Sequence, residues 1–349
     1  SPEKLCVLTM NRHQSELKYH LVSTEDMKSE VVYKENSDTY VEIDDNLIFL
    51  NDGSSFIRTS EKDGYNHIYR IYFDGKEKQI TKGKWDVVEF KGVDQKNGLI
   101  YYTSVEEGPI YQSLYVISLQ GKNKQKLSQQ KGHNDAQFSN GMKYYINTYS
   151  NANTPPVYSL HKADGEKIKV IENNQRLKDN IAKYKTSPKE FFTIQGAEKE
   201  LNAWMIKPPN FDKEKEYPVF MHVYGGPGHN TVRDSWGRNE YLFHQMLAQK
   251  GYIVVSVDPR GTLYRGAAFK KSTYLQLGKL ETKDVITVAK TLGERSYIDK
   301  ERLAIQGWSY GGYLSSLAIT KGADVFAAAV AVAPVTNWRY YDNIYTERF

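Results

Sequence analysis

The run Gly307-Trp308-Ser309-Tyr310-Gly311 has the form G-x-S-x-G, in which the central serine can act as a nucleophile. Residues 302–306 are typical of a buried strand, and residues 311–321 are typical of a helix. The motif needs this context, because a strained turn between strand and helix holds the serine hydroxyl at the carboxyl edge of a sheet. We therefore predict that Ser309 is the nucleophile of a serine hydrolase. The alternative is a glycine-rich turn whose serine has no catalytic role.

A tetrahedral intermediate on Ser309 needs hydrogen-bond donors for its oxyanion. The backbone N–H of Tyr310 directly follows the serine and is one candidate. The second is expected from the loop after an earlier strand, and Val223-Tyr224-Gly225-Gly226-Pro227-Gly228 stands at that place. The glycines allow a close backbone approach, and Tyr224 offers a hydroxyl group. The alternative interpretation of Tyr224 is an aromatic core residue at the end of a strand.

A nucleophilic serine also needs a general base. In this fold the chain order is serine, then aspartate or glutamate, then histidine. All eight histidines precede Ser309, and the residues after it contain carboxyl groups but no histidine. His222 and His229 flank the Tyr224 loop, but they break the expected order, so we interpret both as structural or surface residues. We expect the triad aspartate and histidine to lie beyond residue 349, and the chain to be inactive by itself.

The composition excludes several classes of function. The chain has 349 residues, of which 40% are hydrophobic and 26% charged, and this length allows two domains. The net charge of +5 comes from Lys and Arg interspersed with Asp and Glu, so we expect no nucleic-acid partner. The sequence has no run of about 18 apolar residues, the length of a membrane span. The single cysteine, Cys6, rules out an internal disulfide and a paired thiolate site. We expect no metal and no cofactor.

The first half of the chain, residues 1–185, has short strand-like runs separated by turns. A run centred on a tyrosine recurs at Tyr19, Tyr69, Tyr115 and Tyr158. A period of about 40–50 residues with several strands per unit is typical of β-propeller blades. We predict part of a propeller that begins before residue 1, because four repeats would not close the ring. The alternative is a β-sandwich whose repeats are coincidental.

The second half, residues 186–349, alternates apolar strands with helices, which favours a parallel α/β sheet. A hairpin of residues 191–194 and 201–206 is expected to open it. Buried strands are expected at 217–224, 252–257, 302–306 and 327–332, and helices at 239–250, 281–292 and 311–321. With the serine motif between the third strand and the third helix, we predict the first part of an α/β-hydrolase domain.

The run Gly307–Tyr313 resembles the nucleophile motif of the dipeptidyl peptidase IV branch of the prolyl oligopeptidase family. The resemblance continues through residues 333–342 and 345–348, and upstream through 217–227 and 258–261. In the first half, residues 63–69 and 80–85 are similar as well. It implies an eight-bladed propeller that caps an α/β-hydrolase domain. It also implies release of N-terminal X-Pro or X-Ala dipeptides through an acyl-enzyme on Ser309.

The resemblance further implies the roles of individual residues. The Tyr224 hydroxyl and the Tyr310 N–H would form the oxyanion hole. The family's pocket for the proline ring maps onto Tyr310, Val335, Trp338, Tyr341 and Tyr345. Flat aromatic faces suit a pyrrolidine ring, although the same residues could simply pack in a core. The family binds the free amine of its substrate with a glutamate pair, and we expect that pair before residue 1, with Glu106-Glu107 a chance match.

Two other functions stay open. One is a prolyl tripeptidyl or acylaminoacyl peptidase of the same fold, and the other is a non-catalytic homologue that binds partners through its propeller. The resemblance implies peptide substrates with a penultimate Pro or Ala, a homodimer, and an exported protein of the periplasm or cell surface. The low cysteine content favours a bacterial source over a disulfide-rich animal ectodomain.

Overall fold

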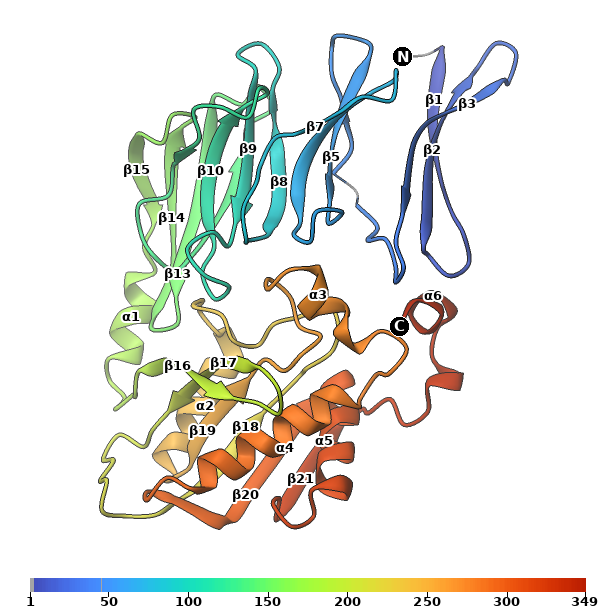
Figure 1. Cartoon of the computed structure of the whole chain (residues 1–349). Coiled ribbons are helices and arrows are strands. Elements are labelled where there is room, and N and C mark those ends of the chain that lie inside the picture. Colours follow the sequence, from blue (N-terminus) through green and yellow to red (C-terminus); the bar gives the residue numbers. More distant parts are fainter. Residues whose placement is uncertain (1–2, 45) are drawn as a thin grey trace.

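The computed structural model describes residues 3–44 and 46–349, which form a β-rich part and an α/β part (Figure 1). Within these residues, the β-rich part consists of antiparallel sheets that stand side by side in chain order, as propeller blades do. The first sheet contains β1 (Lys4–Met10), β2 (Glu16–Ser23) and β3 (Ser29–Asn36). The second contains β4 (Ile48–Phe49), β5 (Ser55–Ser60), β6 (His67–Tyr72) and β7 (Glu77–Gln79). The third contains β8 (Val87–Asp94), β9 (Leu99–Ser104), β10 (Ser113–Ser118) and β11 (Gln125–Lys126). The fourth contains β12 (His133–Phe138), β13 (Tyr144–Asn151), β14 (Thr154–Lys162) and β15 (Lys167–Glu172).

The repeated tyrosines lie at equivalent places in these blades. Tyr69, Tyr115 and Tyr158 lie on the third strands β6, β10 and β14, and Tyr19 lies on β2, the middle strand of the three-stranded sheet. One period of the sequence is therefore one antiparallel sheet, and the predicted repeat is confirmed. Neighbouring blades pack through aromatic rings, as where Tyr19 stacks on Phe56 of β5 with ring centroids 5.5 Å apart.

The α/β part is built on a sheet with the strand order β16-β17-β19-β18-β20-β21. The hairpin expected at its start is present as the antiparallel pair β16 (Lys189–Gln195) and β17 (Glu200–Ile206). The remaining strands pair in parallel: β18 (Tyr217–His222), β19 (Ile253–Val257), β20 (Ile298–Trp308) and β21 (Ala328–Val332). The central strand β19 is a fully buried, mostly apolar run because helices cover both faces of the sheet there.

Two apolar cores lie on opposite faces of this sheet. On one face, α4 (Leu280–Gly293) and α5 (Tyr310–Lys321) contribute side chains such as Val285 and Leu314 to the larger core. On the other face, Ala248 of α2 (Arg238–Gln249) joins Trp204 in the smaller core. Figure 1 shows α4 and α5 in front of the strands and α2 behind them.

The observed elements differ from the expected ones in a few places. Helix α1 (Gln175–Ile181) was not expected, because none of its residues is buried and no apolar stripe marks it. The short elements α3 (Ala267–Lys270), η1 (Lys271–Thr273), η2 (Trp338–Tyr340) and α6 (Asn343–Arg348) were not expected either. The proposed domain boundary at 185/186 stays a prediction and falls between α1 and β16. Among the described residues, no helix has both the length and the hydropathy that crossing a membrane requires.

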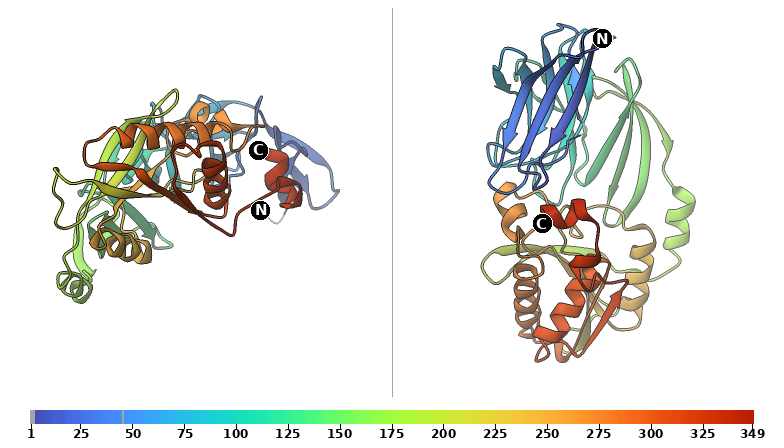
Figure 2. Two further views of the ribbon diagram at one scale, coloured as in Figure 1. Left: turned by 90° about the horizontal axis from the view of Figure 1, so that it is seen from below. Right: turned by 90° about the vertical axis from the view of Figure 1, so that its right-hand side faces the viewer.

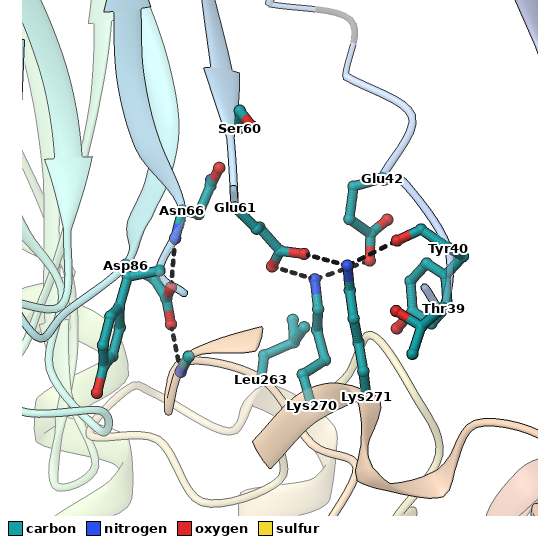
Figure 3. Close-up of polar contacts among 12 residues, drawn as sticks. Thr39, Tyr40, Glu42, Ser60, Glu61, Asn66, Asp86, Leu263, Lys270 and Lys271 are labelled. Carbon is teal, nitrogen blue, oxygen red and sulfur yellow. Dashed lines mark hydrogen bonds and ion pairs between the residues drawn. The ribbon is translucent and has the colours of Figure 1, made fainter. Parts of the chain in front are cut away.

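The two parts are joined by a cluster of buried charges (Figure 3). Lys270 of α3 lies with its ammonium group 2.8 Å from Glu42 and 2.5 Å from Glu61, both from the blades. The neighbouring Lys271 donates to the Tyr40 carbonyl oxygen over 2.6 Å. Beside this cluster the buried carboxylate of Asp86 accepts the backbone N–H of Gly266, which holds the α/β loop against the second and third blades. The junction is thus polar and specific in its pairing.

The last helix, α6, lies in the same junction. Figure 2 shows it between the first blade and the α/β part. Arg348 donates to the side-chain oxygen of Gln14 over 2.6 Å, and Gln14 in turn donates to the carbonyl oxygen of Ile344 over 2.6 Å. The first blade therefore fixes the position of α6.

Replacing Lys270 with methionine should destabilise the protein, because it leaves the Glu61 carboxylate buried without its closest cation. We expect the midpoint of thermal unfolding to fall by about 5 °C or more, measured by calorimetry. The matched control is Lys76→Met, since Lys76 pairs with Asp74 on the exposed surface and such pairs contribute little. Equal midpoints for the two variants would contradict this role of Lys270.

Candidate active site

Ser309 lies between β20 and α5, in the context that its motif requires. Its backbone has φ 56° and ψ −114°, a conformation that costs a non-glycine residue about 1–3 kcal/mol. Two backbone hydrogen bonds hold Ser309. Its N–H donates to the carbonyl oxygen of Val332 over 2.9 Å, and its carbonyl oxygen accepts from the N–H of Tyr313 over 3.0 Å. The side chain is half-buried. The structure thus gives Ser309 the strained turn of a nucleophile elbow.

The glycines of the motif are required by close backbone contacts. A Cβ atom at Gly307 would lie 2.5 Å from the carbonyl oxygen of Val223, and one at Gly312 would lie 2.8 Å from that of Val332. A Cβ atom at Gly311 would also overlap the carbonyl oxygen of Val223, so no side chain fits there. Backbone atoms cannot move aside as side chains can. The glycines therefore let three chain segments converge on Ser309.

Tyr224 comes to the same edge of the sheet because β18 and β20 are parallel neighbours. The N–H of Val223 donates to the backbone carbonyl oxygen of Gln306 over 2.9 Å, which continues the strand pairing just past the end of β18. The ring of Tyr224 lies 6.0 Å from that of Tyr310 and meets His229 edge-on at 4.6 Å. Burial, with a smaller contribution from Tyr341, raises the pKa of Tyr224. Its hydroxyl therefore keeps its proton at neutral pH and can donate.

A buried aspartate anchors the loop that carries Tyr224. Asp258 follows β19 and is 3% exposed. Its carboxylate accepts the backbone N–H groups of Thr231 and Val232 over 2.8 and 3.0 Å, and the side-chain amide of Asn230 over 3.0 Å. Burial raises the pKa of Asp258, and these donors act against that shift. Reasoning from the residues missed this role, although the run at 258–261 carries part of the family resemblance.

An aromatic cluster lies beside Tyr310. The ring of Trp338 is at its centre, with Tyr310 at 5.6 Å, Tyr341 at 5.7 Å and Tyr345 at 5.4 Å between centroids. The structure thus brings together four of the five residues expected to line the proline pocket, from α5, η2, α6 and the link between η2 and α6. Val335 lies half-buried between β21 and η2, and its place in the pocket stays a prediction.

The histidines of this region have structural contacts. His222 shares a hydrogen bond of 2.8 Å with Gln306 and packs on His244, with ring centroids 5.1 Å apart. Burial lowers the pKa of His244 to about 3, so its ring is neutral at physiological pH. Burial also lowers the pKa of His229, although nearby Asp258 acts in the opposite direction. These contacts are consistent with the structural interpretation of His222 and His229.

The structure has two cavities that the sequence did not predict, and one of them adjoins these histidines. One, of about 490 Å³, is lined by Tyr224 and His229 of the loop and by Trp308. The other, of about 810 Å³, lies at the junction of the two parts and is lined by charged groups that include Glu61 and Lys270. Both are shaped by segments far apart in the sequence.

Glu106 and Glu107, which we interpreted as a chance match to the amine-binding pair, form ion pairs within their own blade. Glu107 pairs with Lys126 at 2.7 Å, and Glu106 pairs with Lys124. Both carboxylates thus have partners inside the propeller. In the part of the chain that the structure describes, no group of three or more His, Cys, Asp or Glu residues is arranged to hold a metal ion.

Known protein families match both parts of the chain. Residues 1–156 match the family model described as the dipeptidyl peptidase IV N-terminal region, and residues 238–349 match the prolyl oligopeptidase family. A probable dipeptidyl-aminopeptidase B from Arthroderma benhamiae is 35% identical over the whole chain, which covers 40% of that protein. A protein of the same description from Tuber melanosporum is 36% identical over 84% of the chain, which covers 33% of that protein.

Solved structures agree with these matches. Dipeptidyl peptidase 4 of Porphyromonas gingivalis superposes with a TM-score of 0.94 and 40% identity over 99% of this chain, which covers 49% of that one. A putative dipeptidyl aminopeptidase IV from Bacteroides ovatus gives a TM-score of 0.90 at 29% identity over 99% of this chain and 52% of its own.

These matches test the predicted fold class and the predicted source of the protein. The predicted fold class, propeller blades followed by part of an α/β-hydrolase domain, is confirmed. The chain spans about half the length of the solved structures it matches and 40% or less of the two curated relatives. The bacterial source is not confirmed, since these curated relatives are fungal while the solved structures are bacterial. By sequence and by fold, both parts of the chain are thus similar to members of the dipeptidyl peptidase IV and prolyl oligopeptidase family.

Proposed function

We propose that Ser309 is the nucleophile of a serine dipeptidyl peptidase that releases N-terminal X-Pro or X-Ala dipeptides. The observation that carries this proposal is the position of the aromatic cluster around Trp338 directly beside Tyr310, the residue after the elbow serine. A serine in this strained turn and a cluster of aromatic rings that begins at the next residue suit cleavage after a small cyclic side chain. The names of the relatives, which describe dipeptidyl peptidases, support the same reaction.

The proposed reaction proceeds in two stages. The Ser309 hydroxyl attacks the carbonyl carbon of the second substrate residue, and a general base takes its proton. The Tyr310 N–H and the Tyr224 hydroxyl donate to the resulting oxyanion. The intermediate collapses, the C–N bond breaks, and the protonated base gives its proton to the leaving amine. Water then attacks the acyl-enzyme by the same steps, which releases the dipeptide and restores the Ser309 hydroxyl.

The base in this proposal is a histidine oriented by an aspartate. No histidine follows Ser309 in the sequence, and His222 and His229 have the structural contacts described above. Neither histidine is therefore assigned the role of the base. Glu106 and Glu107 are not assigned to the substrate amine either, since they pair with lysines of their blade.

The aromatic cluster explains the proposed preference for proline. A proline residue within a peptide has no N–H to donate, so its ring gains most from apolar contact. The ring of Trp338 lies 5.4–5.7 Å from the rings of Tyr310, Tyr341 and Tyr345, and the last two rings lie 5.3 Å apart. Alanine is small enough to enter the same pocket but buries less apolar surface, so it should be the poorer substrate.

Assembly and location belong to the proposal as well. From the family resemblance we propose that the whole protein is a homodimer and is exported to the periplasm or cell surface. Sedimentation of the full-length protein and fractionation of the cells that make it are the direct measurements of the two.

The serine assignment is tested in the full-length protein with Gly-Pro-p-nitroanilide as substrate. We expect Ser309→Ala to lower kcat by about 10⁴-fold or more, because the acyl-enzyme cannot form. The matched control is Ser316→Ala, since Ser316 lies two turns along α5 and its hydroxyl only bonds to the Gly312 carbonyl oxygen. Cleavage by Ser309→Ala at the rate of the control would overturn the assignment.

Tyr224→Phe tests the oxyanion donor separately. The variant keeps the ring that packs against His229 and loses only the hydroxyl. We expect kcat to fall by about 10²–10³-fold with a much smaller change in KM, because the bond forms only in the transition state. Tyr313→Phe is the comparison, since the Tyr313 hydroxyl donates to the Leu277 carbonyl oxygen instead. Similar kcat values for the two variants would exclude Tyr224 as the donor.

A further inference from the structure

A carboxyl group that the proposed reaction does not use lies under the active-site edge of the sheet. Glu281, in the first turn of α4, is 0% exposed, and Tyr310, at the start of α5, is 2% exposed. The hydroxyl of Tyr310 donates to a carboxylate oxygen of Glu281 over 2.5 Å. The backbone N–H of Gly278 donates to the same oxygen over 3.2 Å. One buried carboxyl group therefore holds the far end of the Tyr310 side chain.

Packing alone does not explain a glutamate at this position. The second carboxylate oxygen of Glu281 is buried without a hydrogen-bond partner among the described residues. The buried cation Arg260 pairs instead with Asp284, one turn further along α4, through bonds of 2.9 and 3.0 Å. Burial raises the pKa of Glu281 to about 6, which reflects the cost of keeping this charge. An apolar side chain of similar size would fill the space without that cost.

The partner of Glu281 has two functions in the proposed reaction. The backbone N–H of Tyr310 is an oxyanion donor, and its ring is a wall of the proline pocket, 5.6 Å from Trp338 and 6.0 Å from Tyr224. The backbone of Tyr310 is fixed by the elbow, but its ring can rotate about two side-chain bonds. A hydrogen bond at the hydroxyl end removes that freedom, because the two ends of the side chain are then held.

We propose that Glu281 is a positioning residue that fixes the ring of Tyr310 as a wall of the proline pocket by accepting the hydrogen bond of its hydroxyl. The proposal rests on the proposed function. Removal of the acceptor leaves Ser309, Tyr224 and the Tyr310 N–H in place and loosens only the wall of the pocket. The loss should therefore be larger for proline than for alanine at the second substrate position, since the proline ring depends more on contact with that wall.

Four variants of the full-length protein test this proposal: Glu281→Leu, Glu281→Gln, Tyr310→Phe and the Glu281→Leu/Tyr310→Phe double variant. Rates on Gly-Pro- and Gly-Ala-p-nitroanilide are expressed per active site, titrated with a covalent serine reagent, so that a fraction of unfolded protein does not alter them. We expect Glu281→Leu to lower kcat/KM for the proline substrate by about 10- to 100-fold, mainly through KM, and to reduce the ratio of proline to alanine rates. Glu281→Gln keeps a carbonyl oxygen as acceptor and should stay within about threefold of wild type.

The double variant shows whether Glu281 acts through Tyr310. The expected loss is about that of Tyr310→Phe alone, because the hydrogen bond is already absent there. Losses that multiply, or a Glu281→Leu enzyme with the wild-type ratio of proline to alanine rates, would overturn the proposal. If Glu281→Leu does not fold, Tyr310→Phe decides alone, since it keeps the ring and removes only the bond: a wild-type ratio overturns the proposal and a lowered ratio supports it. Glu294→Leu, at the exposed far end of α4, is the control.

The test separates this inference from the proposed function. A wild-type enzyme that cleaves neither substrate, or a Ser309→Ala variant that retains activity, would refute the proposed function itself. A wild-type enzyme that depends on Ser309 but is indifferent to Glu281 would refute only the positioning role.

Discussion

The geometry of this protein depends on one constraint, the unfavourable backbone conformation at Ser309. A serine with φ 56° is stable only where its surroundings leave it no alternative. Those surroundings are the ends of β18, β20 and β21, which approach so closely that glycine is the only residue that fits at 307, 311 and 312. The same approach places the Tyr224 loop beside the serine. The elbow thus sets both the exposure of the Ser309 hydroxyl and the position of Tyr224 beside it.

Beneath this edge lies a layer of buried polar groups, each of which ties one loop or helix to its neighbours. Asp258 holds the Tyr224 loop through its backbone N–H groups. Arg260 and Asp284 join the loop after β19 to α4. Glu281 reaches from α4 to Tyr310 on α5. Buried charges of this kind add little net stability when paired, but removal of one partner is costly. Their effect is to fix positions, which is what a reaction with a short list of reacting atoms requires.

Local patterns were enough to predict much of this arrangement. The G-x-S-x-G run, the apolar strands and the recurrent tyrosines each report on a few neighbouring residues, and they gave the elbow, the parallel sheet and the blades. Tyr224 followed from the order of strands, because parallel strands end at the same edge of a sheet. The aromatic cluster around Trp338 came from family resemblance, since its members lie on short elements with no periodic pattern.

Contacts between distant segments were not predictable in this way. Glu281 sits in an ordinary helical pattern, where a glutamate is expected on the surface. Only the packing of α4 against α5 shows that it is buried against Tyr310. Lys270 likewise meets Glu42 across 228 positions of sequence. From sequence alone, a charged residue is expected on the surface, and only the fold shows whether it is buried against a partner.

Covalent trapping tests most directly whether Ser309 is an activated nucleophile. The full-length protein would be treated with a fluorophosphonate, which reacts with activated serines, and its peptides would be mapped by tandem mass spectrometry. We expect one adduct per chain, located on Ser309 and not on Ser315 or Ser316 of the following helix α5. Intact active protein without an adduct, or with the adduct on another serine, would contradict it.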